Sequence, residues 1–315
     1  MKESLFPPAI ALFSHCHKLY LKYYNEVKGM YNTEADTKKI GQTFRQLRKQ
    51  RKISIKQLSE AIASTSSLEK IETDKTHVSF LTMTYLLHKM NINVEDFIFA
   101  SNLSSSYSYH DFIKKVDHYY RMNDTRSLAY FLHQMSSHES NDPSTFLKMT
   151  IISAYIKDHD PDYAINPALL VATSDFLMTV EYWGKYEIAI FSNCVLILRT
   201  ELIMTIANEL MLSLLNAQSY NTHNEIFDAL INSVEILFRR KHPEAAKKII
   251  KNLESLAIPE TNLIVRLKIK FFDNLLFLAP KEAKSANNHL IAFLRLLGAN
   301  MLASSYEVFI ETMTS

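Results

Sequence analysis

Glycine and cysteine are scarce in this chain, and each shortage excludes a class of structure. The 315 residues include four glycines and two cysteines. A β-sheet protein of this length would need many more glycines in its turns, so the shortage favours helices joined by short loops. Cys16 and Cys194 are too few and too far apart for a disulfide framework, which is typical of a protein in the reducing cytosol.

Sequence patterns of catalysis and metal binding are also missing. There is no nucleophile elbow, no glycine-rich phosphate or dinucleotide turn, and no His-Glu-x-x-His or paired-cysteine spacing. His15, Cys16 and His17 are metal-binding residue types, but adjacent residues do not converge on one face of a helix, and no second cluster completes a site. We therefore expect neither an enzyme nor a bound metal or cofactor.

Long uncharged apolar runs are absent. The longest apolar stretch, residues 188–215, carries three charged residues at helical spacing, which favours a pair of buried amphipathic helices over a membrane span. Residues 5–13 are apolar, but Pro7 and Pro8 interrupt them and no clean cleavage site follows, so we do not expect a signal peptide. These features, with the cysteines, predict a cytoplasmic protein that does not contact a membrane.

The prolines stand where helices would begin. Four of them are placed as in the first turn of a helix: Pro143, Pro167, Pro243 and Pro280. Together with the glycine shortage they predict an all-α fold. Residues 109–315 form a series of amphipathic helices, and the last, over 292–313, would be either a dimer contact or the cap of the array.

A loose internal repeat lies near the C-terminus. The segments HPEAAKKIIKNLESL and PKEAKSANNHLIAFL place Pro243 and Pro280 at an offset of 37 residues. This offset is close to the period of about 34 residues of tetratricopeptide helix pairs. The repeat predicts a tetratricopeptide-like, right-handed array of helices with a concave binding face.

Positive charge is concentrated between Thr37 and Ser59, which contain eight basic residues and no acidic one. Such a run is the electrostatic pattern expected on a surface that meets phosphates. The same region predicts short, capped helices. The first buries Ile40, Phe44 and Leu47 at helical spacing.

Two capping boxes predict the next two helices. Ser54 with Gln57 begins a helix that buries Leu58 and Ile62, and Ser66 with Glu69 begins another that buries Leu68 and Ile71. A fourth helix is expected from about Ser79 to Met90, and a fifth begins near Asn93. These elements define a predicted helix-turn-helix domain over residues 37–101.

The remaining boundaries follow from changes of composition. The serine-rich residues 102–108 predict a linker, and residues 109–315 form the helical-repeat domain. Residues 1–36 are an aromatic-rich extension of uncertain status. Either Met30 is the true start, or the extension is a real helix that packs on the body.

The five short helices with two capping boxes and a basic first half resemble the lambda-repressor-like, or Xre-type, DNA-binding domain. In such domains the second helix crosses the DNA backbone and the third enters the major groove. The stretch LSEAIASTSSLEKIETDKTHVSFLTMTYLLHKMNINVEDF and the segment YWGKYEIAIFSN, residues 182–193, are more narrowly similar to the Rgg family of Gram-positive regulators, in the PlcR-like group. The likeness extends from Thr37 to about Met313.

This resemblance implies a homodimeric transcription regulator that binds double-stranded DNA. It also implies that the C-terminal domain binds a short linear signalling peptide in its concave groove, as in quorum sensing. The chain departs from the usual pattern at Ser67, where glutamine is common, and at Asp74, where glycine is usual. Glu69 on the same helix either accepts from a cytosine amine or repels phosphate.

The candidate DNA-binding residues fall into two groups. We expect contacts at or near the bases from the third helix, and phosphate contacts from the preceding basic helices. The first group is Ser64, Ser66, Ser67 and Lys70, and the second is Arg45, Arg48, Lys49, Lys56 and Gln57. Ser66 can also act as the helix cap, because a hydroxyl has one donor and two acceptor positions.

The candidate peptide-binding residues are polar groups on otherwise apolar helices. The amides of Asn193 and Asn232 can each pair with a peptide N–H and C=O, and Arg199 can hold a carboxylate or a peptide terminus. The alternative is that these side chains cap or bridge neighbouring helices within the array.

Two other functions remain open. One is a ligand-independent repressor whose helical body serves only for dimerisation, with a groove filled by its own side chains. The other is a protein-interaction scaffold that retains a helix-turn-helix without using it. Glu69 and Asp74 favour the scaffold slightly, whereas the basic run between Lys38 and Lys56 counts against it.

Overall fold

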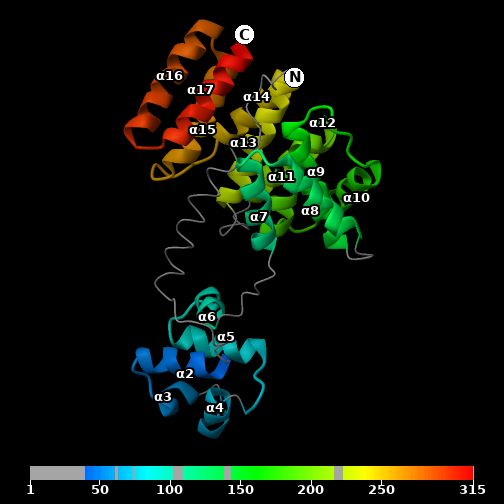
Figure 1. The fold of residues 1–315 in the computed structure, drawn as a ribbon. Helices are drawn as coiled ribbons and strands as arrows, with labels where there is room; N and C mark the ends of the chain where they lie inside the picture. The colour runs from blue at the N-terminus through cyan, green and yellow to red at the C-terminus, as the bar shows by residue number, and fades with distance from the viewer. Residues whose placement is uncertain are drawn as a thin grey trace. The chain divides into compact units, whose positions relative to one another are not determined.

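The computed structural model describes residues 40–60, 63–73, 75–101, 109–137, 143–215 and 223–314. Within these ranges the chain is helical and contains no β-strand, as the glycine shortage predicts (Figure 1). The predicted extension over 1–36, the linker over 102–108, and the expectations placed on Ile62 and Asp74 lie outside these ranges.

The described chain divides into two compact units. One ends at Asp111 and the other begins at Phe112, within the helix Tyr109–Arg121. No helix among the described residues is both long enough and apolar enough to cross a membrane. The same residues bring no three potential metal ligands together.

Five helices form the N-terminal unit. Their bounds are α2 (Ile40–Gln50), α3 (Ile55–Ser59), α4 (Thr65–Glu72), α5 (Phe80–Lys89) and α6 (Val94–Ala100). The predicted capping box at the start of α3 is confirmed, since the Gln57 N–H donates to Ser54 Oγ over 3.2 Å and the Ser54 N–H donates to Gln57 Oε1 over 2.9 Å. Helix α5 begins after Ser79, whose hydroxyl accepts from the N–H of Thr82.

The start of α4 differs from the prediction. Its N-cap is Ser64, whose Oγ accepts from the N–H of Ser67 over 3.1 Å, so Ser66 lies inside the first turn and is not the cap. Ser64 offers the same hydroxyl two residues earlier, and capping there adds residues to the helix. The Ser66–Glu69 capping box is therefore wrong.

A single apolar core joins these short helices. Phe44, Leu58 and Leu68 are fully buried, and Ile71 is nearly so, as the sequence predicts. Ile40 is 40% exposed, which contradicts its place in the predicted stripe. The buried face of α2 instead runs through Gly41, Phe44 and Arg48 at helical spacing, so the first helical residue points away from the core.

The C-terminal unit is an array of longer helices. Their bounds are α7 (Tyr109–Arg121), α8 (Thr125–Ser137), α9 (Pro143–His159), α10 (Pro167–Met178), α11 (Lys185–Cys194), η1 (Val195–Ile197), α12 (Thr200–Leu215), α13 (His223–Arg239), α14 (Pro243–Glu254), α15 (Leu263–Phe277), α16 (Pro280–Leu296) and α17 (Asn300–Thr314). Helices α9, α10, α14 and α16 begin at the four prolines that the sequence assigns to helix starts.

Neighbouring helices of this unit pack in two ways. Consecutive helices pack as pairs from α13 to α17, and α9, α11, α13 and α15 also pack side by side as every second helix. This is the pattern of stacked helix pairs that the repeat predicts. Helix α13 contacts α11, α12, α14 and α15 (Figure 1), and from Ile226 to Leu237 nearly every residue is buried.

The final predicted helix is broken into two. Helix α16 ends at Leu296, and α17 begins at Asn300. Between them Gly298 takes a φ of +75°, a left-handed conformation that ends the helix and that glycine adopts without strain. The expectation of one continuous helix over 292–313 is therefore wrong.

Candidate functional site

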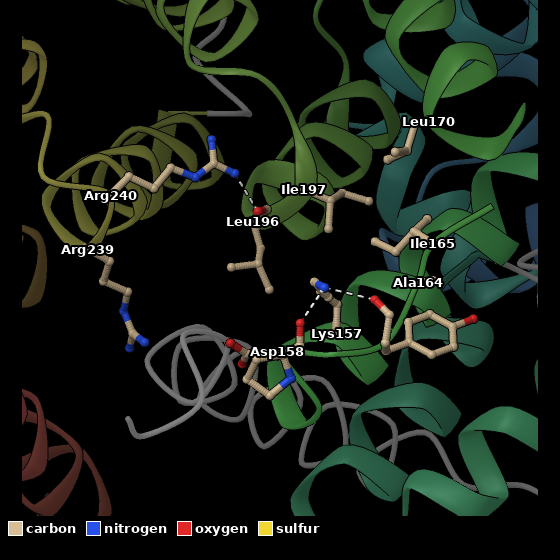
Figure 2. A pocket seen from close by; sticks show the side chains of 11 residues that line it. Lys157, Asp158, Ala164, Ile165, Leu170, Leu196, Ile197, Arg239 and Arg240 are labelled. Atoms are coloured by element: carbon tan, nitrogen blue, oxygen red, sulfur yellow. Dashed lines mark hydrogen bonds between the residues drawn. The ribbon is translucent and has the colours of Figure 1, made fainter. Parts of the chain in front are cut away.

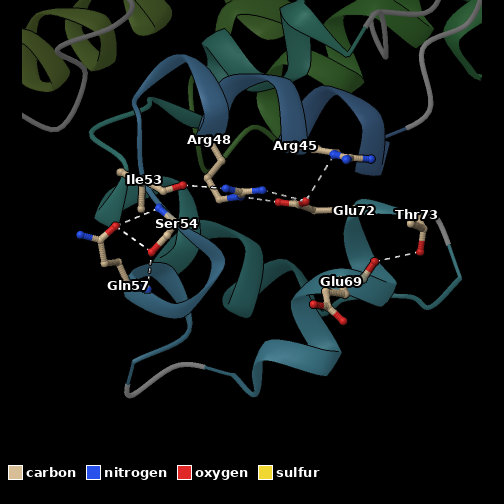
Figure 3. A network of polar contacts seen from close by, with 8 residues as sticks. All are labelled: Arg45, Arg48, Ile53, Ser54, Gln57, Glu69, Glu72 and Thr73. Carbon is tan, nitrogen blue, oxygen red and sulfur yellow. Dashed lines mark hydrogen bonds and ion pairs between the residues drawn. The ribbon is translucent and has the colours of Figure 1, made fainter.

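A buried ion pair lies at the centre of the N-terminal unit (Figure 3). Arg48 Nε lies 2.5 Å from Glu72 Oε1, and Arg48 Nη2 lies 3.0 Å from Glu72 Oε2. Arg48 Nη1 also donates to the carbonyl of Ile53 over 2.6 Å. The two side chains are 7% and 4% exposed, so this two-point pair fixes α4 against α2 inside the unit.

This placement overturns the prediction that Arg48 contacts a DNA phosphate. Its guanidinium points into the unit, toward Glu72, and not toward solvent (Figure 3). The missed signal was its spacing, because Arg48 follows the buried Phe44 by four residues on the same face of α2.

The other predicted phosphate contacts lie on the surface. Arg45, Lys49 and Lys56 are exposed, and Arg45 Nε lies 3.8 Å from the inner Glu72 Oε2. Gln57 is exposed too, but its Oε1 accepts from Ser54 in the capping box. Its amide nitrogen is the part of the side chain that suits a phosphate oxygen.

The start of α4 gathers the predicted base-reading residues. Ser64 Oγ lies 3.1 Å from Ser66 Oγ and 2.8 Å from Ser67 Oγ, so the three hydroxyls form one cluster. Ser66 and Lys70 are exposed and lie one turn apart on the same face. Glu69 is also exposed and points outward from α4 (Figure 3).

Lys89 supports this surface, and sequence reasoning missed it. From α5 its Nζ donates to the carbonyl of Glu60 over 2.9 Å and lies 3.4 Å from the carbonyl of Leu58. These carbonyls belong to the last turn and C-cap of α3, where a cation is favoured. Lys89 therefore fixes the end of α3 where the chain turns toward α4.

The predicted peptide-binding amides lie between helices of the C-terminal unit. Asn193 Oδ1 accepts from the Tyr155 hydroxyl over 2.8 Å, and its Nδ2 donates to the carbonyl of Ala189 over 2.7 Å. Asn232 is 5% exposed, and its Nδ2 donates to Ser192 Oγ over 2.8 Å. The two amides thus join α9, α11 and α13.

A pocket of about 540 Å³ opens in the same unit (Figure 2). Its walls come from the end of α9, the connection to α10, the 3-10 helix η1 and the end of α13, through Lys157, Asp158, Pro161, Tyr163, Ala164, Ile165, Leu170, Leu196, Ile197, Arg239 and Arg240. Arg199 is exposed and does not line it.

Two cations hold the walls of the pocket in place. Lys157 Nζ donates to the carbonyls of Pro161 and Tyr163 over 2.5 and 2.8 Å. Arg240 donates to the carbonyls of Leu198 and Leu196 over 2.6 and 2.5 Å, so it holds the end of η1. Sequence reasoning missed both, because their partners are backbone carbonyls in irregular segments.

Arg239 and Asp158 extend toward the pocket from opposite sides (Figure 2). Arg239 Nη2 lies 2.8 Å from Oε1 of Glu235, a residue that is only 1% exposed. Burial raises the pKa of Glu235 to about 7, although the charge of Arg239 opposes this rise. Asp158 Oδ2 accepts from the Tyr120 hydroxyl over 2.7 Å, and burial raises the pKa of Tyr120 well above its usual value.

Cys194 does not take part in either site. It is fully buried, and burial raises the pKa of its thiol far above the usual range. A thiol in this state is a small apolar side chain and not a reactive group.

Comparison with known proteins gives both a family and a fold. The family model described as the C-terminal domain of the HTH-type transcriptional regulator Rgg matches residues 131–308, more than half of the chain. The crystal structure of the Streptococcus dysgalactiae SHP pheromone receptor Rgg2 has a TM-score of 0.72 at 20% identity, covering 87% of this chain and 99% of that one.

Two further structures have the same fold. A putative transcriptional regulator from Listeria monocytogenes EGD-e has a TM-score of 0.73 at 15% identity, covering 88% of this chain and 98% of that one. A PrgX/iCF10 complex has a TM-score of 0.66 at 15% identity, covering 87% and 95% of the two chains. The fold of this chain is therefore that of helical pheromone receptors and regulators.

Proposed function

Because this chain belongs to the Rgg family of HTH-type transcriptional regulators, we propose that it is a peptide-responsive, sequence-specific DNA-binding regulator. Residues 37–101 bind double-stranded DNA, and residues 109–315 bind a short linear signalling peptide and form a homodimer. The protein acts in the cytoplasm and catalyses no reaction. The observation that carries this proposal is the family match together with the shared fold of a pheromone receptor.

The DNA-binding surface combines α4 with the exposed basic residues before it. Ser66, Ser67 and Lys70 contact bases or their immediate surroundings, with Ser64 capping the helix that carries them. Arg45, Lys49, Lys56 and Gln57 contact phosphates, which position the protein without reading sequence. Arg48 acts from inside the unit, where its pair with Glu72 sets the angle at which α4 is presented.

Peptide binding uses the amides on α11 and α13. Asn193 and Asn232 already bond to neighbouring helices, but a carboxamide has two donor hydrogens and two acceptor positions. Each therefore retains capacity for a peptide backbone. The exposed Arg199 adds positive charge beside α12.

Fluorescence anisotropy on the DNA upstream of the protein's own gene tests the DNA-binding part. Measured across a salt series, Lys70→Ala combined with Ser66→Ala is expected to weaken specific binding about ten- to a hundredfold, because two contacts of α4 are lost. Weak, salt-sensitive binding to random DNA should persist.

A matched control is Lys284→Ala, which removes an exposed lysine from α16 in the other unit. It should bind as the wild type does. If the wild type prefers no site at any salt, with or without peptide, the regulator proposal fails.

One alternative has a specific observation in its favour. The bonds of Asn193 and Asn232 within the helical array are what a ligand-independent repressor would show. Calorimetry with synthetic peptides encoded beside the gene separates the two functions. Binding that changes the anisotropy of the DNA complex supports the peptide-responsive regulator, and its absence supports the repressor.

A further inference from the structure

The pocket between α9, η1 and α13 has an excess of positive charge. Three of its lining side chains are cations, namely Lys157, Arg239 and Arg240, and one is a carboxylate, Asp158. Cations held on low-dielectric walls focus a positive potential into a concave site. The charge of the lining therefore favours an anionic occupant.

The cations are held in place before any ligand arrives. Lys157 and Arg240 are each bonded to two backbone carbonyls, which are neutral, so their positive charges remain uncancelled. Arg239 is held by Glu235, whose Oε1 lies 2.8 Å from its Nη2, and by the ring of Phe309, whose centroid lies 5.2 Å from its guanidinium carbon. Asp158 accepts from Tyr120, which fixes the one carboxylate of the lining. Such preorganisation reduces the cost of ordering these side chains on binding.

The rest of the lining is largely apolar. Ile165, Leu170, Leu196 and Ile197 offer aliphatic surface next to the cations. A volume of about 540 Å³ suits a small ligand or the end of a peptide, since such sites usually measure about 300–1,000 Å³. The pocket thus pairs a cationic corner with room for an aliphatic side chain.

We propose that this pocket, with Arg239 as its principal anion-binding residue and not the exposed Arg199, binds a carboxylate that stands next to an aliphatic side chain. The carboxylate belongs to the signalling peptide, either as its free C-terminus or as an acidic side chain. This inference rests on the proposed peptide-sensing function and names the chemistry of the ligand. A guanidinium suits this task because it binds carboxylate oxygens through two parallel hydrogen bonds.

The buried Glu235 gives the site a dependence on pH. With its pKa raised to about 7, Glu235 gains a proton as the pH falls from 8 to 6, and Arg239 is then less neutralised from behind. The charge of Asp158 also raises the pKa of Glu235, whereas that of the buried Lys268 on α15 lowers it; Lys157 and Arg240 face the pocket. Carboxylate binding is therefore expected to strengthen over this range.

Ligand-observed NMR on the full chain tests the inference with two probes that differ in charge, N-acetyl-leucine and N-acetyl-leucinamide. The acid is expected to bind about tenfold or more tightly than the neutral amide, because a charge-assisted hydrogen bond is lost in the amide. Arg239→Gln should abolish the difference. The matched control Arg126→Gln, which changes an exposed arginine on α8 outside the pocket, should leave it unchanged.

A third probe, acetyl-Asp-Leu-amide, places the carboxylate on a side chain and distinguishes the two sources. Binding of N-acetyl-leucine alone assigns the pocket to a peptide C-terminus, and binding of this probe alone assigns it to an acidic side chain. The proposal is overturned if no acid binds more tightly than the neutral amide, or if Arg199→Gln has the larger effect.

Arg239→Gln leaves Glu235 buried without its partner, so this variant could lose binding because it no longer folds. A second variant separates these two causes. Arg239→Gln combined with Glu235→Gln removes both charges and should show the same loss of carboxylate binding. The NMR readout involves no DNA, so it can succeed while the anisotropy experiment fails. The failure of the carboxylate pocket and that of DNA binding are therefore distinguishable.

Discussion

Each unit of the chain contains a buried glutamate paired with an arginine, and the two pairs differ in what surrounds them. In the N-terminal unit Arg48 and Glu72 are both nearly inaccessible, and the arginine also donates to a backbone carbonyl. In the C-terminal unit Glu235 is buried, but Arg239 lines a pocket. We call Arg48–Glu72 the closed pair and Glu235–Arg239, whose arginine side chain is 14% exposed, the open pair.

This difference shows how one residue combination serves two purposes. A buried ion pair seldom stabilises a fold more than apolar residues would, because desolvation offsets the attraction. Such a pair does fix the relative positions of the elements that carry its two side chains. Arg48 joins Glu72 to Ile53 and so sets α4 against α2, whereas Arg239 connects the buried Glu235 to the lining of a pocket.

Breaking the closed pair is expected to have the largest effect. Glu72→Gln leaves the guanidinium of Arg48 buried without an opposing charge, which should destabilise the N-terminal unit by about 3–5 kcal/mol. Calorimetric unfolding of the full chain, which resolves separate transitions for separate units, measures this. Glu69→Gln on the exposed face of α4 is the control. Equal shifts for the two variants would mean that the buried pair contributes no more than a surface carboxylate.

Removing the open pair's glutamate charge should stabilise the protein in a pH-dependent way. The pKa of Glu235 is about 7 when folded and near its usual 4.5 when unfolded, so the folded state binds more protons between these values. Stability is therefore lost as the pH rises from about 4.5 to about 7, by up to about 3 kcal/mol.

Glu235→Gln removes this loss, so its advantage over the wild type should grow across that window and stay constant above pH 7. Urea unfolding at pH 5 and pH 8 checks the expectation. A variant with the same relative stability at both pH values would show that Glu235 ionises normally in the folded protein.

A smaller effect is expected from the lysine that fixes the turn before α4. Lys89→Met keeps the apolar stem but removes the ammonium that donates to Glu60 and Leu58 carbonyls. We expect a loss of about 1 kcal/mol in stability and weaker specific DNA binding. His88→Met, at the exposed neighbouring position, should leave DNA binding unchanged. The prediction fails if both variants bind alike.

The smallest expected effect comes from replacing a lysine that follows a helix in each unit. Lys52 follows α2 with a φ of 57°, and Lys241 follows α13 with a φ of 60°. Lysine is strained in this left-handed region, so Lys52→Gly and Lys241→Gly should each stabilise their own unit by roughly 0.5–1 kcal/mol. Thermal unfolding measures both. A destabilised variant would show that the lost lysine contacts outweigh the relieved backbone.

These lysines also show how far the scarcity of glycine could predict the fold. The shortage correctly indicated helices, but it did not remove left-handed helix ends, which Asn91, Asn123 and the two lysines provide. The sequence placed the start of α3 because capping is local, involving Ser54 and Gln57 within one turn. It misplaced the cap of α4 because several serines there satisfy the same local rule.

The amino-acid sequence by itself determined the features that depend on neighbours along the chain: helical class, proline-led helix starts, the basic stretch and the family. Only the tertiary structure decided which charged residues face inward, because that depends on partners far away in sequence. Arg48 meets Glu72 across 24 positions, and Arg240 meets the carbonyl of Leu198 across 42. Local spacing places Arg48 on the buried face of α2 but does not identify Glu72 as its partner, so the closed ion pair and the cationic pocket emerged only when the helices packed.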